Sequence, residues 1–322
     1  MLKTKTKYTW EGWESSGRED WVFSVKHPCE LIGTHAKLID KELRESEKVE
    51  YCVYSPRTSS TSTPFGLRSE EASRGICVTD KRFIVSEDRH IKGVEPNLIS
   101  IGFEDIQYFN IGNALILGWF SIHYCVNDSS KDMTILFSSI GKHHFEKLIR
   151  SYKKYRGKGG INECGIETYY PSSFLYNIKD NVHRNDLKTL ISSGERCVLT
   201  FSCQYLWGVL KKKRWSWGKQ FDVYLTNNTT LLLTNRNLLI ARNGRGESAS
   251  LAVDTMNISL DKIEKVELLR EETSQGMIHR FKTCLIKKSG FEILDIPLMG
   301  KDKNVEASLN TVVSLLNNRK EK

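Results

Sequence analysis

Residues 230–240 read Thr-Leu-Leu-Leu-Thr-Asn-Arg-Asn-Leu-Leu-Ile, and this stretch decides the fold. Apolar runs on both sides of Thr-Asn-Arg predict two short strands joined by a tight turn. Asn and Asp suit such a turn because their side chains bond to nearby backbone and tolerate left-handed geometry. An earlier copy at residues 75–85 reads Gly-Ile-Cys-Val-Thr-Asp-Lys-Arg-Phe-Ile-Val. The two copies predict an internal repeat.

The same order of elements surrounds each copy of this turn motif. A helix comes first, then a strand opened by a glutamate, the turn motif, a strand of the pattern Ile-x-apolar-x-x-Ile, a hairpin and a closing helix. The offset between equivalent residues grows slowly along the chain: it is 148 for Glu47 and Glu195, 155 for Thr79 and Thr234, and 164 for Phe145 and Leu309. Loop insertions explain the drift, and the period is far too long for a solenoid, whose repeats have roughly 20–50 residues.

In the first copy, Thr34 is expected to cap the leading helix, and residues 47–54 alternate like a strand. The Ser- and Thr-rich stretch 55–73 is predicted to be a long loop. Residues 99–106 are expected to form one strand. Residues 119–126 and 133–137 are expected to form a hairpin that turns at 127–130, before a helix with Phe145, Leu148, Ile149 and Tyr152 on one face.

In the second copy, Asn185 is expected to cap the leading helix, and a strand is predicted over 197–206. Residues 258–263 match 101–106. A hairpin is predicted over 281–296, with its turn at 288–290. The final helix is expected to carry Val305, Leu309, Val312, Val313 and Leu316.

The composition describes an ordinary globular chain, with 39% hydrophobic and 27% charged residues among 322. The formal net charge of +9 favours anionic partners. We find no apolar run of the roughly 18–20 residues that a membrane-spanning helix needs, and no apolar signal core after the basic N-terminus. We therefore expect a cytoplasmic protein, at most peripheral to a membrane.

The eight cysteines show no Cys-x-x-Cys pair and no metal-ligand spacing. Those within expected strands are predicted to be buried reduced thiols: Cys52, Cys77, Cys125, Cys197 and Cys284. His143 and His144 are adjacent on a helix and point about 100° apart, so we expect a surface or helix-end role and no metal. We find no phosphate loop and no nucleophile elbow, so we expect neither an enzyme nor a cofactor.

This order of elements resembles the bacterial PH-like and GRAM-like domains, members of the pleckstrin-homology superfold. The residues that carry the resemblance are 78–84 with 103–106, and 233–239 with 260–263. The resemblance covers most of 34–155 and 183–318 and implies, in each copy, a strongly bent antiparallel sheet closed by a C-terminal helix. Binders of phosphoinositides, peptides and other proteins share this fold, so function stays open.

We therefore predict a mainly β fold with capping helices (β+α), built from two PH/GRAM-like domains in tandem. The expected boundaries are an aromatic and polar N-terminal extension at 1–33, a first domain at 34–156, a linker at 157–182 and a second domain at 183–322. The extension contains Trp10, Trp13 and Trp21 and is expected either to cover the first domain or to bind a partner. The oligomeric state and the relative orientation of the domains stay open.

The strongest candidate for a functional site lies between the first two strands of the second domain. Its expected lipid- or anion-binding residues are Lys211, Lys212, Lys213, Arg214, Trp215, Trp217 and Lys219. In the resembled family this is the first hairpin loop, a frequent headgroup-binding position. Clustered cations attract an anionic surface, and tryptophan is at home at headgroup level. The family's second basic pair is missing here, because Lys219 is followed by Gln-Phe-Asp. The alternative is a solvated hairpin tip with its tryptophans folded onto the sheet.

The other basic positions are weaker candidates. Lys81 and Arg236 share a position after the turn, whereas Arg82 does not align with Arg236. The shared position could bind an anion, but a solvated turn charge is the expectation. The first copy has only scattered arginines near its Ser/Thr loop: Arg57, Arg68 and Arg74.

We expect a non-enzymatic adaptor whose partner is an anionic membrane surface. A protein- or peptide-binding scaffold is the main alternative, with a peptide added to a sheet edge or held between sheet and C-terminal helix. Weak nucleic-acid binding is a third possibility, because residues 153–158 interleave bases with an aromatic. The charge is spread over both halves, +3 in residues 1–160 and +6 in the rest, which makes nucleic acid an unlikely partner.

Overall fold

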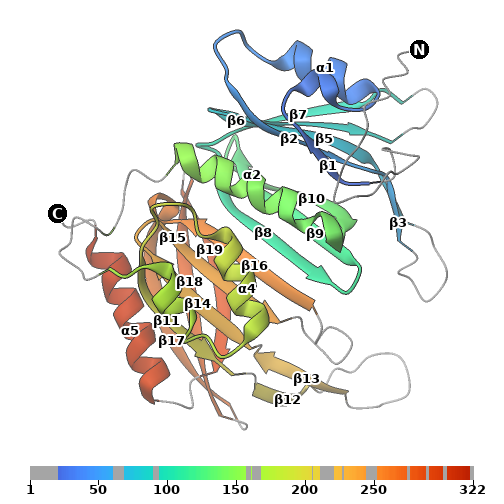
Figure 1. The fold of residues 1–322 in the computed structure, drawn as a ribbon. Coiled ribbons are helices and arrows are strands. Elements are labelled where there is room, and N and C mark those ends of the chain that lie inside the picture. The colour runs from blue at the N-terminus through green and yellow to red at the C-terminus, as the bar shows by residue number, and fades with distance from the viewer. Residues whose placement is uncertain are drawn as a thin grey trace.

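The computed structural model describes residues 21–60, 69–89, 94–156, 161, 168–204, 206–210, 221–226, 228–243, 252–273, 276–287, 290–299 and 303–319. It is mainly β, with several antiparallel sheets and a few helices (Figure 1). In this part of the chain, no helix is long and apolar enough to cross a membrane.

The order of elements recurs, and two repeats are named by their helices. The first repeat runs from α1 to α2: α1 (Thr34–Glu42), β2 (Val49–Ser55), β3 (Thr58–Ser60), β4 (Ser69–Glu71), β5 (Ser73–Thr79), β6 (Arg82–Asp88), β7 (Asn97–Gly102), β8 (Ile106–Ala114), β9 (Leu117–Val126), β10 (Ser129–Ser138) and α2 (Lys142–Tyr155). The second repeat runs from α4 to α5: α4 (Asn181–Leu190), β11 (Cys197–Cys203), β12 (Leu206–Leu210), β13 (Phe221–Thr226), β14 (Thr229–Thr234), β15 (Asn237–Asn243), β16 (Ala252–Ser259), β17 (Ile263–Thr273), β18 (Gly276–Lys287), β19 (Gly290–Met299) and α5 (Lys303–Asn318).

The turn motif makes the same hydrogen bonds in both repeats. The hydroxyl of Thr79 accepts the N–H of Arg82 at 3.1 Å, and the hydroxyl of Thr234 accepts the N–H of Asn237 at 2.8 Å. Each hydroxyl also donates to the carbonyl of that same residue, at 3.2 and 3.1 Å. The threonine therefore closes the turn, a role that the sequence analysis gave to the Asx residue.

The Asx residue of each motif instead anchors the neighbouring strand. Asp80 exchanges two hydrogen bonds with Lys48, through its own N–H and through its side-chain oxygen, both at 3.0 Å. Asn235 exchanges the same two bonds with Arg196, both at 2.9 Å. The equivalence of the two repeats thus extends to individual hydrogen bonds.

The two repeats share a continuous sheet. Strand β8 of the first pairs antiparallel with β16 of the second, from Ala114 opposite Ala252 to Tyr108 opposite Ile258. The resulting seven-stranded sheet has the order β10-β9-β8-β16-β15-β14-β11. A five-stranded sheet (β1-β2-β5-β6-β7) and a three-stranded sheet (β17-β18-β19) flank it. The pairing of β8 with β16 ties the repeats together.

Helices α2 and α4 contact each other (Figure 1). Phe145 of α2 and Leu187 of α4 belong to one buried cluster, which also takes in Leu239 of β15. Each repeat therefore lends apolar side chains to a common core. A second cluster lies under α5 in the second repeat, around Leu309 and Phe281.

The pattern Ile-x-apolar-x-x-Ile is a corner and not a single strand. Strand β7 ends at Gly102 and β8 begins at Ile106, and in the second repeat a 3-10 turn at Leu260–Lys262 separates β16 from β17. Phe103 and Leu260 are buried within these corners. The corner lies over the core, where the chain passes from one sheet to the next. Its apolar residues are therefore buried at the spacing that suggested a strand.

Both expected helix caps are wrong. Gly33 occupies the cap position of α1, and Thr34 donates its hydroxyl to Asp88 at 2.8 Å. Asp180 caps α4 by accepting the N–H groups of Val182 and His183, so α4 begins four residues before Asn185. Sequence spacing cannot distinguish the cap of α4, because Asp180, Asn181 and Asn185 all precede its apolar stripe.

The stretch 55–73 contains strands where a loop was predicted. β3 and β4 pair with each other, from Thr58 opposite Glu71 to Ser60 opposite Ser69. In the second repeat the predicted strand 197–206 breaks after Cys203, and β12 then pairs with β13. Both repeats thus extend their first hairpin beyond the main sheet. The hairpin β9–β10 forms as expected, with a tighter turn at Asn127 and Asp128, which both have positive φ.

The segments outside the two repeats also pack against them. In the N-terminal extension, β1 (Phe23–Val25) pairs antiparallel with β2, and Phe23 is fully buried. In the linker, Tyr169 forms a β-bridge with Cys197, and α3 (Pro171–Leu175) follows. Trp10 and Trp13 lie outside the described residues.

Candidate functional site

The predicted basic loop connects β12 and β13. Residues 211–220, which include Lys211, Lys212, Lys213, Arg214, Trp215, Trp217 and Lys219, lie outside the described residues. The two residues that flank this segment are described: Leu210 pairs with Phe221 at the end of the hairpin. In Figure 1 this hairpin extends from the lower end of the second repeat, away from α2. The cluster of five cations and two tryptophans therefore belongs to the connection of a hairpin outside the main sheets.

The first repeat has the matching hairpin but lacks this charge. Arg57 beside β3 is exposed, and Arg68 lies outside the described residues. Arg74 is buried and pairs with Glu87 at 3.1 Å. This arginine holds two strands of the first repeat together and is not available to an anion.

A cavity of about 430 Å³ lies at the base of the second hairpin. Its walls are β11, the start of β14, the connection between α3 and α4, and the first turn of α5. The lining residues are Asn177, Ile178, Lys179, Asp180, His183, Thr200, Phe201, Ser202, Cys203, Gln204, Asn228, Thr229, Thr230 and Val305. The sequence analysis missed this cavity because its walls come from four separate segments.

His183 hydrogen-bonds to the polar side chains on one side of the cavity. The ring is buried, with Nε2 2.8 Å from Oδ1 of Asn243 and Nδ1 2.9 Å from the hydroxyl of Thr230. The amide oxygen can only accept, so Nε2 donates and Nδ1 accepts from Thr230. Ser202 lies 2.9 Å from the same hydroxyl. Because both ring nitrogens are engaged within the protein, His183 fixes α4 on the sheet and is not poised as a general base.

The thiol at the edge of the cavity is also unsuited to chemistry. Burial raises the pKa of Cys203 to about 12, so the reactive thiolate is scarce near neutral pH. With His183 committed, the cavity offers hydroxyl groups, three side-chain amides, the charged Lys179 and Asp180, and apolar surface. Such a lining is suited to holding a ligand.

The first repeat has a histidine at the same place as His183. His35 of α1 is buried, with Nδ1 2.8 Å from the hydroxyl of Ser86 and Nε2 3.0 Å from that of Ser73. A side chain at Gly75 would come within 2.8 Å of the His35 Cβ atom, so only glycine fits there. Gly75 is equivalent to Thr230, which has room for a side chain and bonds to its own histidine.

Arg82 follows the shared basic position in the first repeat and holds two segments of that repeat together. It is buried, and its guanidinium lies 2.8 Å from Glu47 and 2.7 Å from Glu42. Burial disfavours the charged form, but the hydrogen bonds to Glu47 and Glu42 outweigh it and raise the pKa of Arg82. Lys81 is exposed and Arg236 is half-buried, so the shared position after the turn does carry an accessible charge in the first repeat.

The basic run that suggested nucleic-acid binding is engaged in ion pairs. Lys153 is buried and lies 3.4 Å from Glu195. Lys154 pairs with Glu50 at 2.8 Å, and Arg156 pairs with Asp261 at 3.4 Å. Burial lowers the pKa of Lys153, although the Glu195 carboxylate opposes this effect. Lys158 lies outside the described residues. These pairs offset charge in the described part of the run, and the other stretch that interleaves cations with aromatics, 211–219, lies outside the described residues.

His143 and His144 lie in the first turn of α2, as expected of helix-end residues, but His144 is buried. Its Nδ1 lies 3.1 Å from the hydroxyl of Tyr51, and burial lowers its pKa to about 3. His143 is exposed and its Nδ1 donates to the carbonyl of Ile140 at 3.1 Å. Among the described residues, no group of three or more His, Cys, Asp or Glu side chains could hold a metal ion.

The cysteines of the described part carry no disulfide. Four of the five predicted to be buried are buried, namely Cys52, Cys77, Cys125 and Cys197, while Cys284 is half-buried. Cys52 stands opposite Cys77 across β2 and β5. A hydrogen bond with Cys77 and burial both raise the pKa of Cys52, which keeps this thiol protonated.

Comparison with known proteins assigns one part of the chain. Residues 43–154 match the family model of the bacterial PH domain. This range runs from the end of α1 to the end of α2, so the first repeat carries a PH-like domain. No curated protein and no solved structure matches the chain significantly.

Proposed function

We propose that the protein is a non-enzymatic adaptor made of two PH/GRAM-like domains, and that the second contacts an anionic membrane surface. The contact residues are Lys211, Lys212, Lys213, Arg214, Trp215, Trp217 and Lys219. The observation that supports the proposal is the pairing of β12 with β13, the two strands that this segment connects in the sequence. The PH-like domain at 43–154 supports a binding role in general, since members of such folds serve mostly as binding modules. On this proposal the protein acts in the cytoplasm and associates peripherally with the membrane.

Electrostatics accounts for the expected affinity. Each Lys or Arg near an anionic surface contributes about 1 kcal/mol, and the contribution falls off within a Debye length. Five cations on one loop therefore suffice for reversible recruitment without a shaped headgroup pocket. The two tryptophans add interfacial anchoring, because an indole ring places apolar surface and one N–H at headgroup depth.

Vesicle co-sedimentation tests the proposal. We expect the protein to pellet with phosphatidylserine-rich vesicles at low salt and to stay in the supernatant at high salt. Reversing Lys211, Lys212, Lys213 and Arg214 to glutamate should abolish pelleting. The matched control reverses four exposed lysines of the first repeat and the N-terminal segment, Lys26, Lys37, Lys41 and Lys131, so that the net charge changes equally. Equal loss in both variants, or binding that survives the first reversal, contradicts a specific loop contact.

A second candidate function is a protein-binding scaffold without lipid contact. The cavity beside β11 favours it, because it combines apolar surface with a few hydroxyl groups next to a sheet edge. A saturable peptide interaction that persists without lipid, together with no vesicle binding, supports the scaffold over the membrane adaptor.

A further inference from the structure

The turn between β8 and β9 exposes two large apolar side chains. Leu115 and Ile116 form this two-residue turn, because Ala114 pairs with Leu117 at the ends of the strands. Leu115 has a φ of 52°, which is uncommon for residues other than Gly, Asn and Asp. Leu115 is 69% exposed and Ile116 is 84% exposed. The chain therefore keeps apolar residues at a turn where the backbone favours other residue types.

The fold does not require apolar residues at such a turn. The next turn along the chain, between β9 and β10, has Asn127 and Asp128 at positive φ. In the second repeat, the sequence has Ser274 and Gln275 at the equivalent place, between β17 and β18. Polar residues of this kind are ordinary in turns. The apolar pair between β8 and β9 therefore serves something other than the hairpin.

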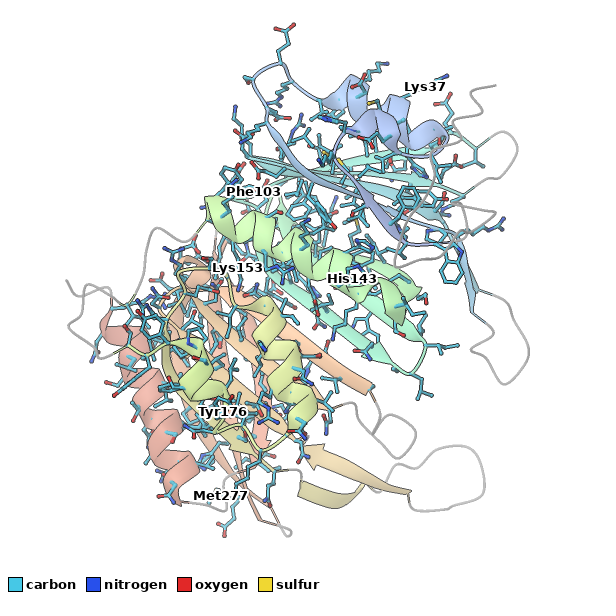
Figure 2. The ribbon with its side chains drawn as sticks, viewed as in Figure 1. Lys37, Phe103, His143, Lys153, Tyr176 and Met277 are labelled. Carbon is cyan, nitrogen blue, oxygen red and sulfur yellow. The ribbon has the colours of Figure 1, made fainter. Side chains whose placement is uncertain are left out.

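A third exposed apolar side chain lies beside this turn. The backbone carbonyl of Ile116 accepts the N–H of Ser139 at 2.8 Å. This bond brings the neighbouring Ile140, which is 57% exposed, next to the turn. His143 follows in the first turn of α2, and Figure 2 shows it at this end of the helix. The start of α2 and the β8–β9 turn therefore lie together.

A fourth exposed apolar side chain comes from α4. Lys142 Nζ lies 3.0 Å from Oδ1 of Asn113 in β8 and 2.7 Å from Oδ2 of Asp186 in α4, so this helix also approaches the turn. Val182 precedes Asp186 by one helical turn and is 51% exposed. We call the four exposed side chains the apolar rim: Leu115, Ile116, Ile140 and Val182.

The apolar rim lies at the same end of the seven-stranded sheet as the β12–β13 hairpin. One row of paired residues crosses the sheet from Cys203 through Thr229, Arg242 and Asp254 to Gly112. Because β11 ends at Cys203 and β14 begins at Thr229, the hairpin leaves the sheet at this row. Beyond the same row, β8 continues into the turn. Four strand steps put β8 about 19 Å from β11. Figure 1 shows β8 and β9 running towards the side of the molecule where the β12–β13 hairpin lies.

The rim is too small for a stable protein interface. Four partly exposed aliphatic side chains offer on the order of 200–300 Å² of apolar surface. A stable protein–protein interface buries about 800 Å² on each partner. The rim is also convex, because a two-residue turn forms its centre, so a protein partner would need a matching pocket. A bilayer needs neither a large area nor a pocket, since apolar side chains can enter the boundary between headgroups and acyl chains.

The rim brings little net charge of its own. The two cations that border it are paired, Lys142 with Asp186 at 2.7 Å and Arg242 with Asp254 at 2.8 Å. Attraction to an anionic surface would therefore come from the loop 211–219, which the hairpin carries at the same end of the sheet. The two features are complementary, because the loop provides charge and the rim provides aliphatic side chains.

We propose that the apolar rim is a second membrane contact, in which Leu115 and Ile116 enter the headgroup region of an anionic bilayer. This inference rests on the proposed membrane contact of loop 211–219, since the rim is too small to hold the protein on a bilayer by itself. It adds the first repeat to the contact. It also specifies which end of the seven-stranded sheet faces the membrane.

A turn replacement tests the rim while preserving the hairpin. Leu115→Gly with Ile116→Ser installs a pair that suits positive φ at the first turn position, so the variant should be at least as resistant to urea as the unmodified protein. We expect it to bind phosphatidylserine-rich vesicles at least tenfold more weakly at low salt. The matched control is Asn127→Gly with Asp128→Ser, at the other end of β9, which should bind like the unmodified protein. Unchanged binding by the first variant overturns the proposal.

An environment-sensitive label measures insertion directly. A nitrobenzoxadiazole group is attached to Ile116→Cys after Cys29, Cys164 and Cys284, the cysteines not known to be buried, are replaced by serine. Its emission should rise and shift to the blue on phosphatidylserine-rich vesicles, whereas the same label on Asn127→Cys should not respond. A label at 116 that stays unchanged while the protein sediments with the vesicles overturns the rim contact and leaves the loop contact standing.

Tethering separates the two contacts. A full chain with Lys211, Lys212, Lys213 and Arg214 reversed to glutamate is held by an N-terminal histidine tag on phosphatidylcholine vesicles that contain a nickel-chelating lipid. We expect the label at 116 to respond there, because the tag replaces the loop as the source of attraction. A response on tethered vesicles combined with no vesicle binding by the untagged, unreversed protein supports the rim and contradicts the loop contact alone.

Two results overturn the rim contact in this design. The first is a label at 116 that does not respond on tethered vesicles, whatever the untagged protein does. The second is a dimer in light scattering that Leu115→Gly with Ile116→Ser converts to a monomer, because it would assign the rim to a second copy of the chain.

Discussion

Glu47 and Glu195 stand at the same position in the two repeats, but they neutralise cations from different places. Glu47 binds Arg82 of its own repeat, which is also held by Glu42 and Ser100. Glu195 lies 3.4 Å from Lys153, which comes from α2 of the other repeat. Figure 2 shows Lys153 on α2, on the side that faces the second repeat. The first repeat therefore supplies the cation for its buried carboxylate from within, whereas Glu195 accepts hydrogen bonds from its own repeat but takes its cation from the neighbouring one.

Removal of the two glutamates gives the largest expected difference. Glu195→Ala leaves Lys153 buried without a carboxylate, and we expect it to lower the free energy of unfolding by about 3–5 kcal/mol. Glu47→Ala should cost less, about 1–2 kcal/mol, because Arg82 keeps Glu42 and Ser100. Urea denaturation measures both. Equal losses would show that the neighbouring repeat is not the critical partner.

The double variant Lys153→Met with Glu195→Gln serves as the control for that comparison. It removes both charges together, so it should recover most of the stability that Glu195→Ala loses. A double variant as unstable as Glu195→Ala would assign the loss to the hydrogen bonds that Glu195 receives from Ser192 and Asn237.

The covered edge of the first repeat gives the next largest effect. Phe23→Ala removes a fully buried ring from β1 and should cost about 3 kcal/mol. Phe291→Ala is the matched control, because Phe291 is 61% exposed and should change stability by no more than about 0.5 kcal/mol. Thermal and urea unfolding measure both variants. A small loss for Phe23→Ala would mean that β1 does not stabilise the first repeat.

The two closing helices, α2 and α5, should contribute differently to the pH dependence of stability. Burial lowers the pKa of His144 from 6.5 to about 3, so the folded protein keeps the ring neutral while the unfolded chain takes up a proton below pH 6.5. Stability therefore falls as the pH falls from 6.5 towards 3. Ser308 occupies the equivalent position of α5 and does not titrate.

His144→Gln should reduce this acid sensitivity. Between pH 6.5 and 5, the loss of stability should be smaller than in the unmodified protein by about 2 kcal/mol, because each pH unit contributes about 1.4 kcal/mol. His143→Gln changes the exposed neighbour and should keep the original slope. Urea unfolding across this range distinguishes the two, and identical slopes in all three proteins would place the sensitivity elsewhere.

The turn threonines should show the smallest difference between the repeats. Thr79→Val and Thr234→Val each remove a hydroxyl that accepts two backbone N–H groups, so each should cost about 1 kcal/mol or slightly more. Similar losses in urea unfolding would support the equivalence of the two turns. A loss confined to one repeat would contradict it.

Most of the repeated architecture was predictable from local patterns. The turn motif, the hairpins β9–β10 and β18–β19 and both closing helices follow from periodicity and turn chemistry. The wrong predictions occur where one pattern is compatible with two structures. Residues 99–106, for example, were predicted to form one strand, but the chain turns a corner between Gly102 and Ile106. The basic loop was visible in the sequence because its charges are adjacent. The cavity was not visible in the sequence. The offset of 148 nevertheless aligns Tyr54 of β2 with Ser202 of β11, which indicates that these two strands differ at that position.

The sequence by itself determined the two-fold order of elements and the equivalence of their residues. That information is local, because alternation, helical spacing and turn residues act over a few positions. Only the tertiary structure decided that β8 pairs with β16, that Lys153 neutralises Glu195, and that β1 pairs along the edge of β2 while Tyr169 bridges β11 at Cys197. These outcomes depend on which distant surfaces meet, and the pairing of strand edges and buried charges across repeats leaves no periodic signal in the chain.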